Sequence, residues 1–410
     1  METKKNICIV GVTRFSLLLP GVAQWKLSAQ AETLESYRDR LYDPTRLDAR
    51  MKIFSQLSLP QLAKGSHGTN YRHIVQHSSS LPARYQSQLR TLSQQFEFLE
   101  IVCSDEKSVH DHSVATAFRD MVDEDARHDT RLAWFRLDDD DIVSDHYFDR
   151  IVPYVESEPP GRVVSLGLGY SMIYSNGQLW DMRLDYRPKN SIGQLYVCAF
   201  DDTSGRLVEP PRGDHSIIDQ FAPTVLDSRQ PSFITVVHPM QDGRAHLESD
   251  QALAAVEKEQ GNKPMADLTD LEFEFSQIRN STVVADFPLE TVMTDGNLTV
   301  DPIRETVSAH GDLAVEVHVT AAQPQTDGRV ILGMRFASGT RPQATGRWVE
   351  VDRDTLAVGF VVSSPTMRFR AHLLGVPDTS ELVEISVWVS RSFVGSVTLD
   401  ELRIGESQKQ

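Results

Sequence analysis

The chain is poor in cysteine and in long apolar runs. Its three cysteines, Cys8, Cys103 and Cys198, lie far apart among 410 residues, and none forms a CxxC pair or a Cys/His zinc spacing. Each lies in apolar sequence, so we expect buried thiols in a reducing compartment. The apolar runs near the N-terminus are broken by Thr13 and Arg14 and fall short of the roughly 18 residues of a membrane span. We expect a cytoplasmic protein, with peripheral contact at the inner face of the membrane left open.

Positive charge is also scarce. Asp and Glu number 58 against 41 Lys and Arg, which gives a formal net charge of −17. A surface of this sign repels nucleic acid and anionic lipid, so an anionic substrate needs a local device: a metal ion, a helix N-terminus or a few arginines. The sequence contains no Walker lysine loop and no protein-kinase motif, so nothing in it supports another phosphoryl-transfer or nucleotidyl-transfer enzyme.

Two regions differ in the pattern of their apolar residues. Up to about residue 284, apolar strands (6–12, 71–79, 96–104, 131–137) alternate with amphipathic helices (47–65, 81–96, 114–125). This alternation predicts an α/β domain with a Rossmann-like, mostly parallel sheet flanked by helices. Beyond it, short alternating runs separated by Gly, Pro, Asp and Asn predict an all-β sandwich, resembling a jelly roll. We therefore expect two domains, 1–284 and 285–410.

Four consecutive aspartates, Asp138 to Asp141, follow the apolar run "RLAWFRL" directly. Mutual repulsion and desolvation oppose such a cluster unless a cation or cationic ligand accompanies it. In an open parallel sheet, ligands bind beyond the carboxyl ends of the strands, which is where these carboxylates are delivered. Oxygen ligands at this density suit Mg²⁺ or Mn²⁺. A solvated acidic turn is the alternative.

"RLDDDD", preceded in the chain by "GVTRFSL" and "RMKIFSQLSLPQL", resembles the rhamnosyltransferases among nucleotide-sugar glycosyltransferases of the GT-A fold. The resemblance covers roughly the first 245 residues. It implies that an Asp-x-Asp motif binds a divalent ion, which holds the diphosphate of the donor and stabilises its departure. Four aspartates fit this motif in two registers. We prefer Asp138 and Asp140, with Asp140 as the direct ligand, Asp141 in reserve and Asp138 and Asp139 also facing the donor.

The same resemblance implies further site residues. In "GDHSIIDQF", Asp214 is the candidate general base for an inverting attack by the acceptor hydroxyl, and His215 is a candidate acceptor contact. The alternative role for Asp214 is that of a helix N-cap, and a retaining mechanism is not excluded. His238, at the end of "PSFITVVH", is a candidate metal ligand, for which a structural core histidine is the alternative. Arg244 is a candidate diphosphate ligand.

The loop after the first strand is expected to receive the nucleotide, so Thr13 and Arg14 are donor-site candidates. An Asn-Gly turn at residues 176–177 predicts a β-hairpin beside the acceptor site. Trp180 in that hairpin is a candidate for stacking on a sugar, with a core position as the alternative.

Trp348 and Trp388 of the sandwich are aromatic platforms for a sugar ring, but burial, packing or oligomerisation compete with that role. The favoured function is metal-dependent glycosyl transfer to a glycan or glycolipid acceptor, with rhamnose suggested by the family. The alternative is a non-catalytic carbohydrate-binding or cell-envelope protein with a structural Ca²⁺ site.

Overall fold

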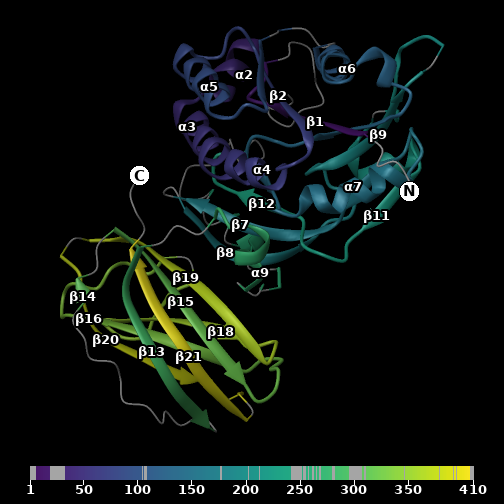
Figure 1. Ribbon diagram of the computed structural model, residues 1–410. Coiled ribbons are helices and arrows are strands. Elements are labelled where there is room, and N and C mark those ends of the chain that lie inside the picture. Colours follow the sequence, from purple (N-terminus) through teal and green to yellow (C-terminus); the bar gives the residue numbers. More distant parts are fainter. Residues whose placement is uncertain are drawn as a thin grey trace. The chain divides into compact units, whose positions relative to one another are not determined.

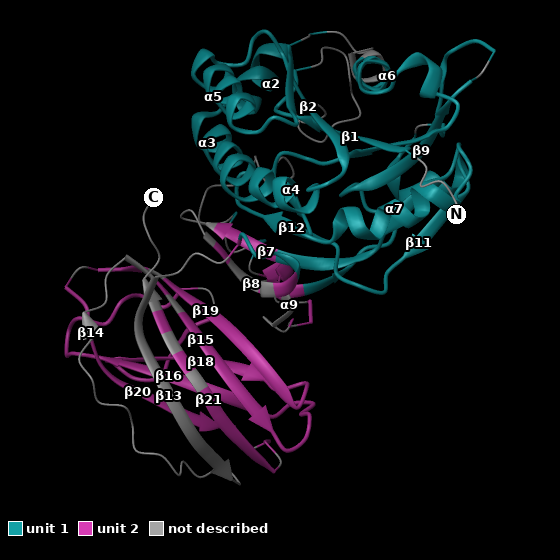
Figure 2. Cartoon of the chain, in the orientation of Figure 1, with its two compact units in different colours: residues 1–171, 184–256, 274–277 teal, residues 172–183, 257–273, 278–410 magenta. Residues whose placement is uncertain are grey.

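The structure is a computed structural model of the chain. It describes residues 6–18, 33–103, 105, 109–175, 178–201, 203–211, 213–241, 252, 255–256, 258–260, 263–264, 266, 269–278, 282–294, 307–308, 311–345, 347–377, 379–390, 392–393 and 395–406. The chain forms two compact units, residues 1–171, 184–256 and 274–277 in the first and residues 172–183, 257–273 and 278–410 in the second (Figure 2). The expected boundary at 284/285 lies close to the last crossing between these units, at 277/278.

The first unit is built on a mostly parallel sheet with the strand order β11-β6-β9-β4-β1-β2-β3 (Figure 1). Its strands are β1 (Asn6–Arg14), β2 (Asn70–His77), β3 (Leu99–Cys103), β4 (Thr130–Arg136), β6 (Val163–Leu166), β9 (Gln194–Phe200) and β11 (Thr224–Asp227). Strands β1 to β4 run parallel, and β9 is antiparallel to both β4 and β6. The short strand β10 (Leu207–Val208) pairs with β9. This arrangement confirms the expected parallel-rich α/β sheet.

Helices cover both faces of this sheet because its central strands are apolar on both sides. On one face, Ile9 of β1 and Phe135 of β4 belong to a core shared with α3 (Pro44–Lys52), α4 (Leu59–Gly65), α5 (Ala83–Gln95) and α7 (Tyr147–Ser157). On the other, Val10 and Trp134 pack with α6 (Val109–Met121) and the 3₁₀ helix η3 (His215–Gln220). The π-helical segment η1 (Ile53–Ser58) joins α3 to α4, and α2 (Leu34–Leu41) precedes α3.

A second sheet contains Asp141 and ends directly before His238, which are two of the predicted metal ligands. Its order is β5-β12-β7-β8, with β5 (Asp141–Val143), β12 (Phe233–Val237), β7 (Leu168–Ser175) and β8 (Gln178–Tyr186). The last of the four aspartates, Asp141, pairs across to Thr235 of β12, and His238 follows β12 directly. Strands β7 and β8 confirm the predicted hairpin, whose Asn-Gly turn lies outside the described residues.

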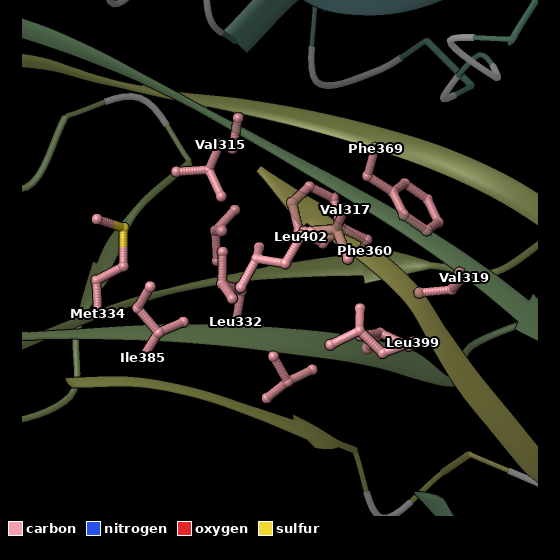
Figure 3. Close-up of a cluster of buried hydrophobic side chains, with 14 of the residues drawn as sticks. Val315, Val317, Val319, Leu332, Met334, Phe360, Phe369, Ile385, Leu399 and Leu402 are labelled. Carbon is pink, nitrogen blue, oxygen red and sulfur yellow. The ribbon is translucent and has the colours of Figure 1, made fainter. Parts of the chain in front are cut away.

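The second unit contains two antiparallel sheets around one apolar core. The orders are β13-β21-β15-β19 and β14-β20-β16-β18-β17. Their bounds are β13 (Thr282–Thr294), β14 (Val307–Ser308), β15 (Gly311–Ala321), β16 (Arg329–Phe336), β17 (Val349–Glu350), β18 (Thr355–Val361), β19 (Thr366–Val376), β20 (Glu381–Val389) and β21 (Ser396–Glu406). Alternate side chains of both sheets meet in this core, among them Val317, Phe369, Leu332 and Phe360 (Figure 3). A β-sandwich was predicted here and is confirmed, whereas its jelly-roll connectivity stays a prediction.

Two further expectations concern the cysteines and the membrane. Cys8 and Cys198 are buried free thiols, as expected, but Cys103 is exposed because it ends β3 at the edge of the sheet, so its predicted burial is wrong. In the described parts of the chain, no helix combines the length and apolarity needed to cross a bilayer.

Candidate active site at the aspartate loop

The four aspartates lie where β4 leaves the parallel sheet and β5 begins. The backbone amide of Leu137 donates to the carbonyl of Val12, so β4 and β1 stay paired up to the loop. Asp138 to Asp141 then form a tight turn, closed by the Asp141 amide donating to the Asp138 carbonyl at 3.2 Å. Asp139, Asp140 and Asp141 are all buried, and Asp138 is partly exposed. The cluster is therefore not the solvated acidic turn that was the alternative.

Arg50 of α3 supplies a buried counter-charge. One guanidinium nitrogen contacts Asp139 Oδ1, and the other lies 2.9 Å from Asp140 Oδ2. Arg46, one helical turn earlier, is also buried and donates to Ser16 Oγ and to the Leu41 carbonyl. Two arginines on one buried helix face are costly unless they have partners. Arg50 has its partners in the two carboxylates, and the charge of Arg46 also acts on Asp139 and Asp140.

His238 completes the buried part of the cluster. Its Nε2 lies 3.1 Å from Asp140 Oδ2, the oxygen that also faces Arg50. Burial lowers the pKa of His238, and the carboxylate of Asp140 opposes that shift. The neutral tautomer that donates from Nε2 leaves a lone pair on Nδ1, which has no hydrogen-bond partner within the described structure.

The buried carboxyl groups titrate differently. Burial raises the pKa of Asp139 to about 6, with Arg50 opposing and Asp140 adding to the shift. For Asp140, burial also favours the neutral form, but Arg50 and the hydrogen bond with His238 prevail and the net pKa is lowered. Burial and the charges of Asp140 and Asp138 raise the pKa of Asp141 well above its usual value. Asp140 is thus the carboxylate most firmly held in its charged form.

More accessible arginines surround Asp138. Arg136 binds Asp138 Oδ1 through Nε at 3.0 Å and Nη2 at 2.7 Å, and Asp138 raises the pKa of this guanidinium. The predicted donor-site residue Arg14 lies close by: burial and the charge of Arg136 lower its pKa to about 10, while Asp138 opposes the shift. The structure thus brings Arg14 to the aspartate loop.

An ion pair between Asp185 of β8 and Arg187 also contributes charge near the aspartate loop. Asp185 is buried, and its Oδ2 accepts from Thr235 Oγ1 at 3.0 Å and from Arg187 Nη2 at 2.9 Å. Arg187 is 44% exposed, and its charge lowers the pKa of Asp141. Asp185 therefore holds an accessible guanidinium whose charge reaches Asp141 of the aspartate loop.

Asp214 and His215 sit at the start of η3. Asp214 caps this helix, accepting from the Ser216 amide at 2.9 Å and the Ser216 hydroxyl at 2.7 Å. These hydrogen bonds lower the pKa of Asp214, whose side chain is exposed. Burial lowers the pKa of His215, on which the charges of Arg136, Asp138 and Arg187 also act. Asp214 therefore caps η3, and its role as a general base stays a prediction. The charges that act on His215 show that η3 lies within electrostatic reach of the aspartate loop.

Thr13 has a structural role at the end of β1. Its hydroxyl is fully buried, lies 2.8 Å from His73 Nε2 and donates to the Leu137 carbonyl at 2.8 Å. Its predicted contact with the donor stays a prediction. Arg244 and the side chain of Trp180 lie outside the described residues, so their predicted roles also stand as predictions.

The two tryptophans of the sandwich differ. Trp348 is buried in the core, and its Nε1 donates to the His372 carbonyl at 2.8 Å, so a platform role for it is wrong. Trp388 is half-buried, and its ring lies against Gly333, where an added Cβ would come within 2.6 Å of a ring carbon.

The donor chemistry of the aspartate loop fits a divalent ion. It offers carboxylate oxygens and one imidazole, and the buried Oδ2 of Asp139 has no hydrogen-bond partner among the described residues. Mg²⁺ and Mn²⁺ commonly take one or two protein carboxylates and complete their shell with water and phosphate. In the described part of the chain, no group of three His, Cys, Asp or Glu side chains is arranged so that it could hold a metal ion.

Apart from Arg14, the cations of this site are not apparent from the sequence. They are Arg46, Arg50, Arg136 and Arg187, the last of which binds Asp185. The available signal was the i, i+4 spacing of Arg46 and Arg50 on the apolar side of a helix, beside Leu47 and Met51.

Solved structures resemble parts of the chain. S. aureus TarS 1–349 is 9% identical over 64% of this chain and 67% of its own, with a TM-score of 0.28. BiXyn10A CBM1, in its apo form, is 10% identical over 31% of this chain and 99% of its own, with a TM-score of 0.20. The module CBM6cm-2 of Cellvibrio mixtus lichenase 5A, solved with cellotriose, is 11% identical over 31% of this chain and 100% of its own, with a TM-score of 0.18. Scores of this size carry no conclusion about this chain.

A match to a family model shows which family the chain belongs to. No curated protein matches the chain. The family described as "Putative rhamnosyl transferase" matches residues 8–249, well over half of the chain, which confirms the resemblance seen in its motifs. Membership in an enzyme family argues against a non-catalytic protein with a structural Ca²⁺. The chain belongs to this rhamnosyl transferase family and is a glycosyltransferase.

Proposed function

We propose that the protein transfers a sugar from a nucleotide-diphosphate donor to a hydroxyl of a glycan or glycolipid, with Mn²⁺ or Mg²⁺ and with inversion. The family description makes a deoxyhexose such as rhamnose the first donor sugar to test. One observation carries the proposal: Asp140 is a buried carboxylate at the end of a sheet strand, in contact with both Arg50 and His238. Such a group is expensive to bury and is typical of a functional site.

On the donor side, Asp138, Asp140, Asp141 and His238 would hold the divalent ion. When bound, the ion stabilises the negative charge that develops on the departing nucleoside diphosphate. Arg136 is 38% exposed and Arg187 is 44% exposed, so both guanidinium groups are open to phosphate oxygens. These local cations explain how a chain of charge −17 binds a dianion.

On the acceptor side, Asp214 is the proposed general base. Its lowered pKa keeps it a carboxylate at neutral pH, ready to accept the proton of the attacking hydroxyl. Its hydrogen bonds with Ser216 fix the carboxylate but also make it a weaker base. His215, beside it, is the proposed contact for the acceptor. Trp180 and Arg244 remain candidates on the acceptor and donor sides respectively.

The experiment is a transfer assay with uridine, thymidine and guanosine diphosphate sugars, each with and without Mn²⁺. Release of nucleoside diphosphate that needs both acceptor and metal is the expected result. Asp140→Asn should reduce turnover at least about a hundredfold, a typical loss for one electrostatic group of an active site. Asp129→Asn, the same change at an aspartate that is 82% exposed, is the matched control and should retain activity. Equal turnover of the two variants would remove the aspartate loop from the mechanism.

A further inference from the structure

The aspartate loop is fixed differently at its two ends. At its first end, the amide of Leu137 donates to the carbonyl of Val12, so the parallel sheet holds the chain in place. At its second end, the loop runs into β5, which has only three residues and lies at the edge of the sheet β5-β12-β7-β8. Strand pairing gives such a short edge strand few hydrogen bonds, so its register depends on other contacts.

Residues 274–277 supply contacts to the two residues that follow β5. The amide of Asp145 donates to the Glu274 carbonyl at 2.7 Å. The hydroxyl of Ser144 donates to Glu274 Oε2 at 2.6 Å. Ser276 in turn donates its hydroxyl to Asp145 Oδ2 at 2.7 Å. Backbone and side chains of one short segment therefore hold the carboxyl end of β5.

The 274–277 segment is itself bound to helices of the α/β unit. Glu274 is 5% exposed, and its second carboxylate oxygen binds Arg150 of α7. Gln61 of α4 is fully buried, donates to the Glu274 carbonyl at 3.1 Å and accepts from the Gln277 amide at 3.3 Å. Moving a buried carboxylate away from such partners is costly, because it leaves charges and donors unpaired. The segment is therefore a fixed support for β5.

We propose that the 274–277 segment sets the position of β5 and, through it, of the aspartate loop, and that Glu274 is a positioning residue for donor binding. The link to the donor rests on the proposed function. The segment lies beyond residues 8–249, which the family match covers, so the matched region alone lacks this support.

A shift of β5 acts directly on the aspartate loop. Asp141 is both the first residue of β5 and the last of the four aspartates, and its amide closes the turn on the Asp138 carbonyl at 3.2 Å. Displacements of about 1 Å in an active site can cost about a hundredfold in rate. Loosening the residues after β5 should therefore open this turn and weaken the binding of the donor.

The first experiment measures hydrogen exchange of the Asp141 amide in the full chain without any ligand. Glu274→Gln keeps the shape of the side chain and removes the charge that Ser144 and Arg150 face. We expect the Asp141 amide to exchange at least about tenfold faster in this variant than in the wild type. Asp227→Asn is the matched control, because it also turns a partly buried, arginine-bound carboxylate into an amide, at the end of β11. It should leave the exchange of Asp141 unchanged.

Ser276→Ala is a milder second variant, which loses the hydroxyl that donates to Asp145. It should speed the exchange of the Asp141 amide about threefold, and it decides the question if Glu274→Gln does not fold. Exchange of Asp141 as slow in Glu274→Gln as in Asp227→Asn would overturn the proposal.

Kinetics separate positioning from a loss of folded protein. In the transfer assay, Glu274→Gln should raise the KM for the donor at least about fivefold and leave the KM for the acceptor unchanged. An enzyme that is merely less stable has a lower kcat and the same two KM values. An unchanged KM for the donor would overturn the positioning role of Glu274. If the wild type transfers no sugar, the proposed function fails, and the exchange experiment still decides whether the segment holds the loop.

Discussion

Replacing His73 with glutamine should flatten the acid side of the stability profile of the α/β unit. His73 lies on β2, fully buried, between Tyr71 Oη at 2.5 Å and Thr13 Oγ1 at 2.8 Å. Burial lowers its pKa from 6.5 to about 3. The unfolded chain therefore binds a proton at pH values where the folded protein does not.

The sign and size follow from linkage. Because the folded pKa is depressed, the contribution of His73 is complete above pH 6.5 and is lost progressively as the pH falls toward 3. Between pH 7 and pH 4.5, the unfolded state gains about 2.5 kcal/mol from protonation of this one residue, while the folded state gains almost nothing. The wild type should lose that amount, and His73→Gln should not.

Hydrogen exchange of the β1 and β2 amides, corrected for its intrinsic pH dependence, measures this free energy for the sheet alone. Only the difference between the two pH values is compared, because the variant also loses contacts at every pH. His67→Gln, at an exposed histidine, is the control and should lose as much as the wild type. If His73→Gln lost as much stability as His67→Gln on acidification, the reasoning would be refuted.

Three further predictions concern the stability of the folded protein. Glu274→Ala removes the carboxylate that binds Arg150 and Ser144 Oγ in a buried cluster, and it should lower the free energy of unfolding by about 3 kcal/mol, measured by urea titration; an unchanged midpoint would contradict it. Gly11→Ala places a Cβ 2.3 Å from His73 Nδ1 and should cost about 2 kcal/mol, seen as a lower Tm. Trp348→Phe loses the hydrogen bond to the His372 carbonyl and should lower the free energy of unfolding of the sandwich by about 1 kcal/mol, measured by urea titration; an unchanged midpoint would contradict it.

The elements that carry the site could be predicted because their sequence patterns are local. The apolar run "NICIVGV" became β1, and the strand before the aspartates became β4, so the loop lies at the carboxyl end of a parallel strand as expected. His238 was expected at a strand end and lies beside Asp140. These inferences needed only periodicity and the rule that ligands bind beyond strand ends.

The counter-charges could not be predicted in the same way. Arg50 and Asp139 are 89 residues apart, and a single sequence gives no sign that they meet. In sequence, Arg50 resembles any helix cation. The same limit applies to Asp185, whose partner Thr235 comes from another strand. Long-range pairing of charges is set by tertiary packing, which short motifs do not encode.

The return of residues 274–277 to the α/β unit affects how the protein can be divided for expression. Glu274 accepts a hydrogen bond from Ser144, and Ser276 donates to Asp145, both just beyond β5. A fragment that stops at residue 249, where the family match ends, would leave the partly buried Arg150 without its carboxylate. Truncations meant to isolate the catalytic part should therefore extend past Gln277, and shorter ones should unfold or aggregate.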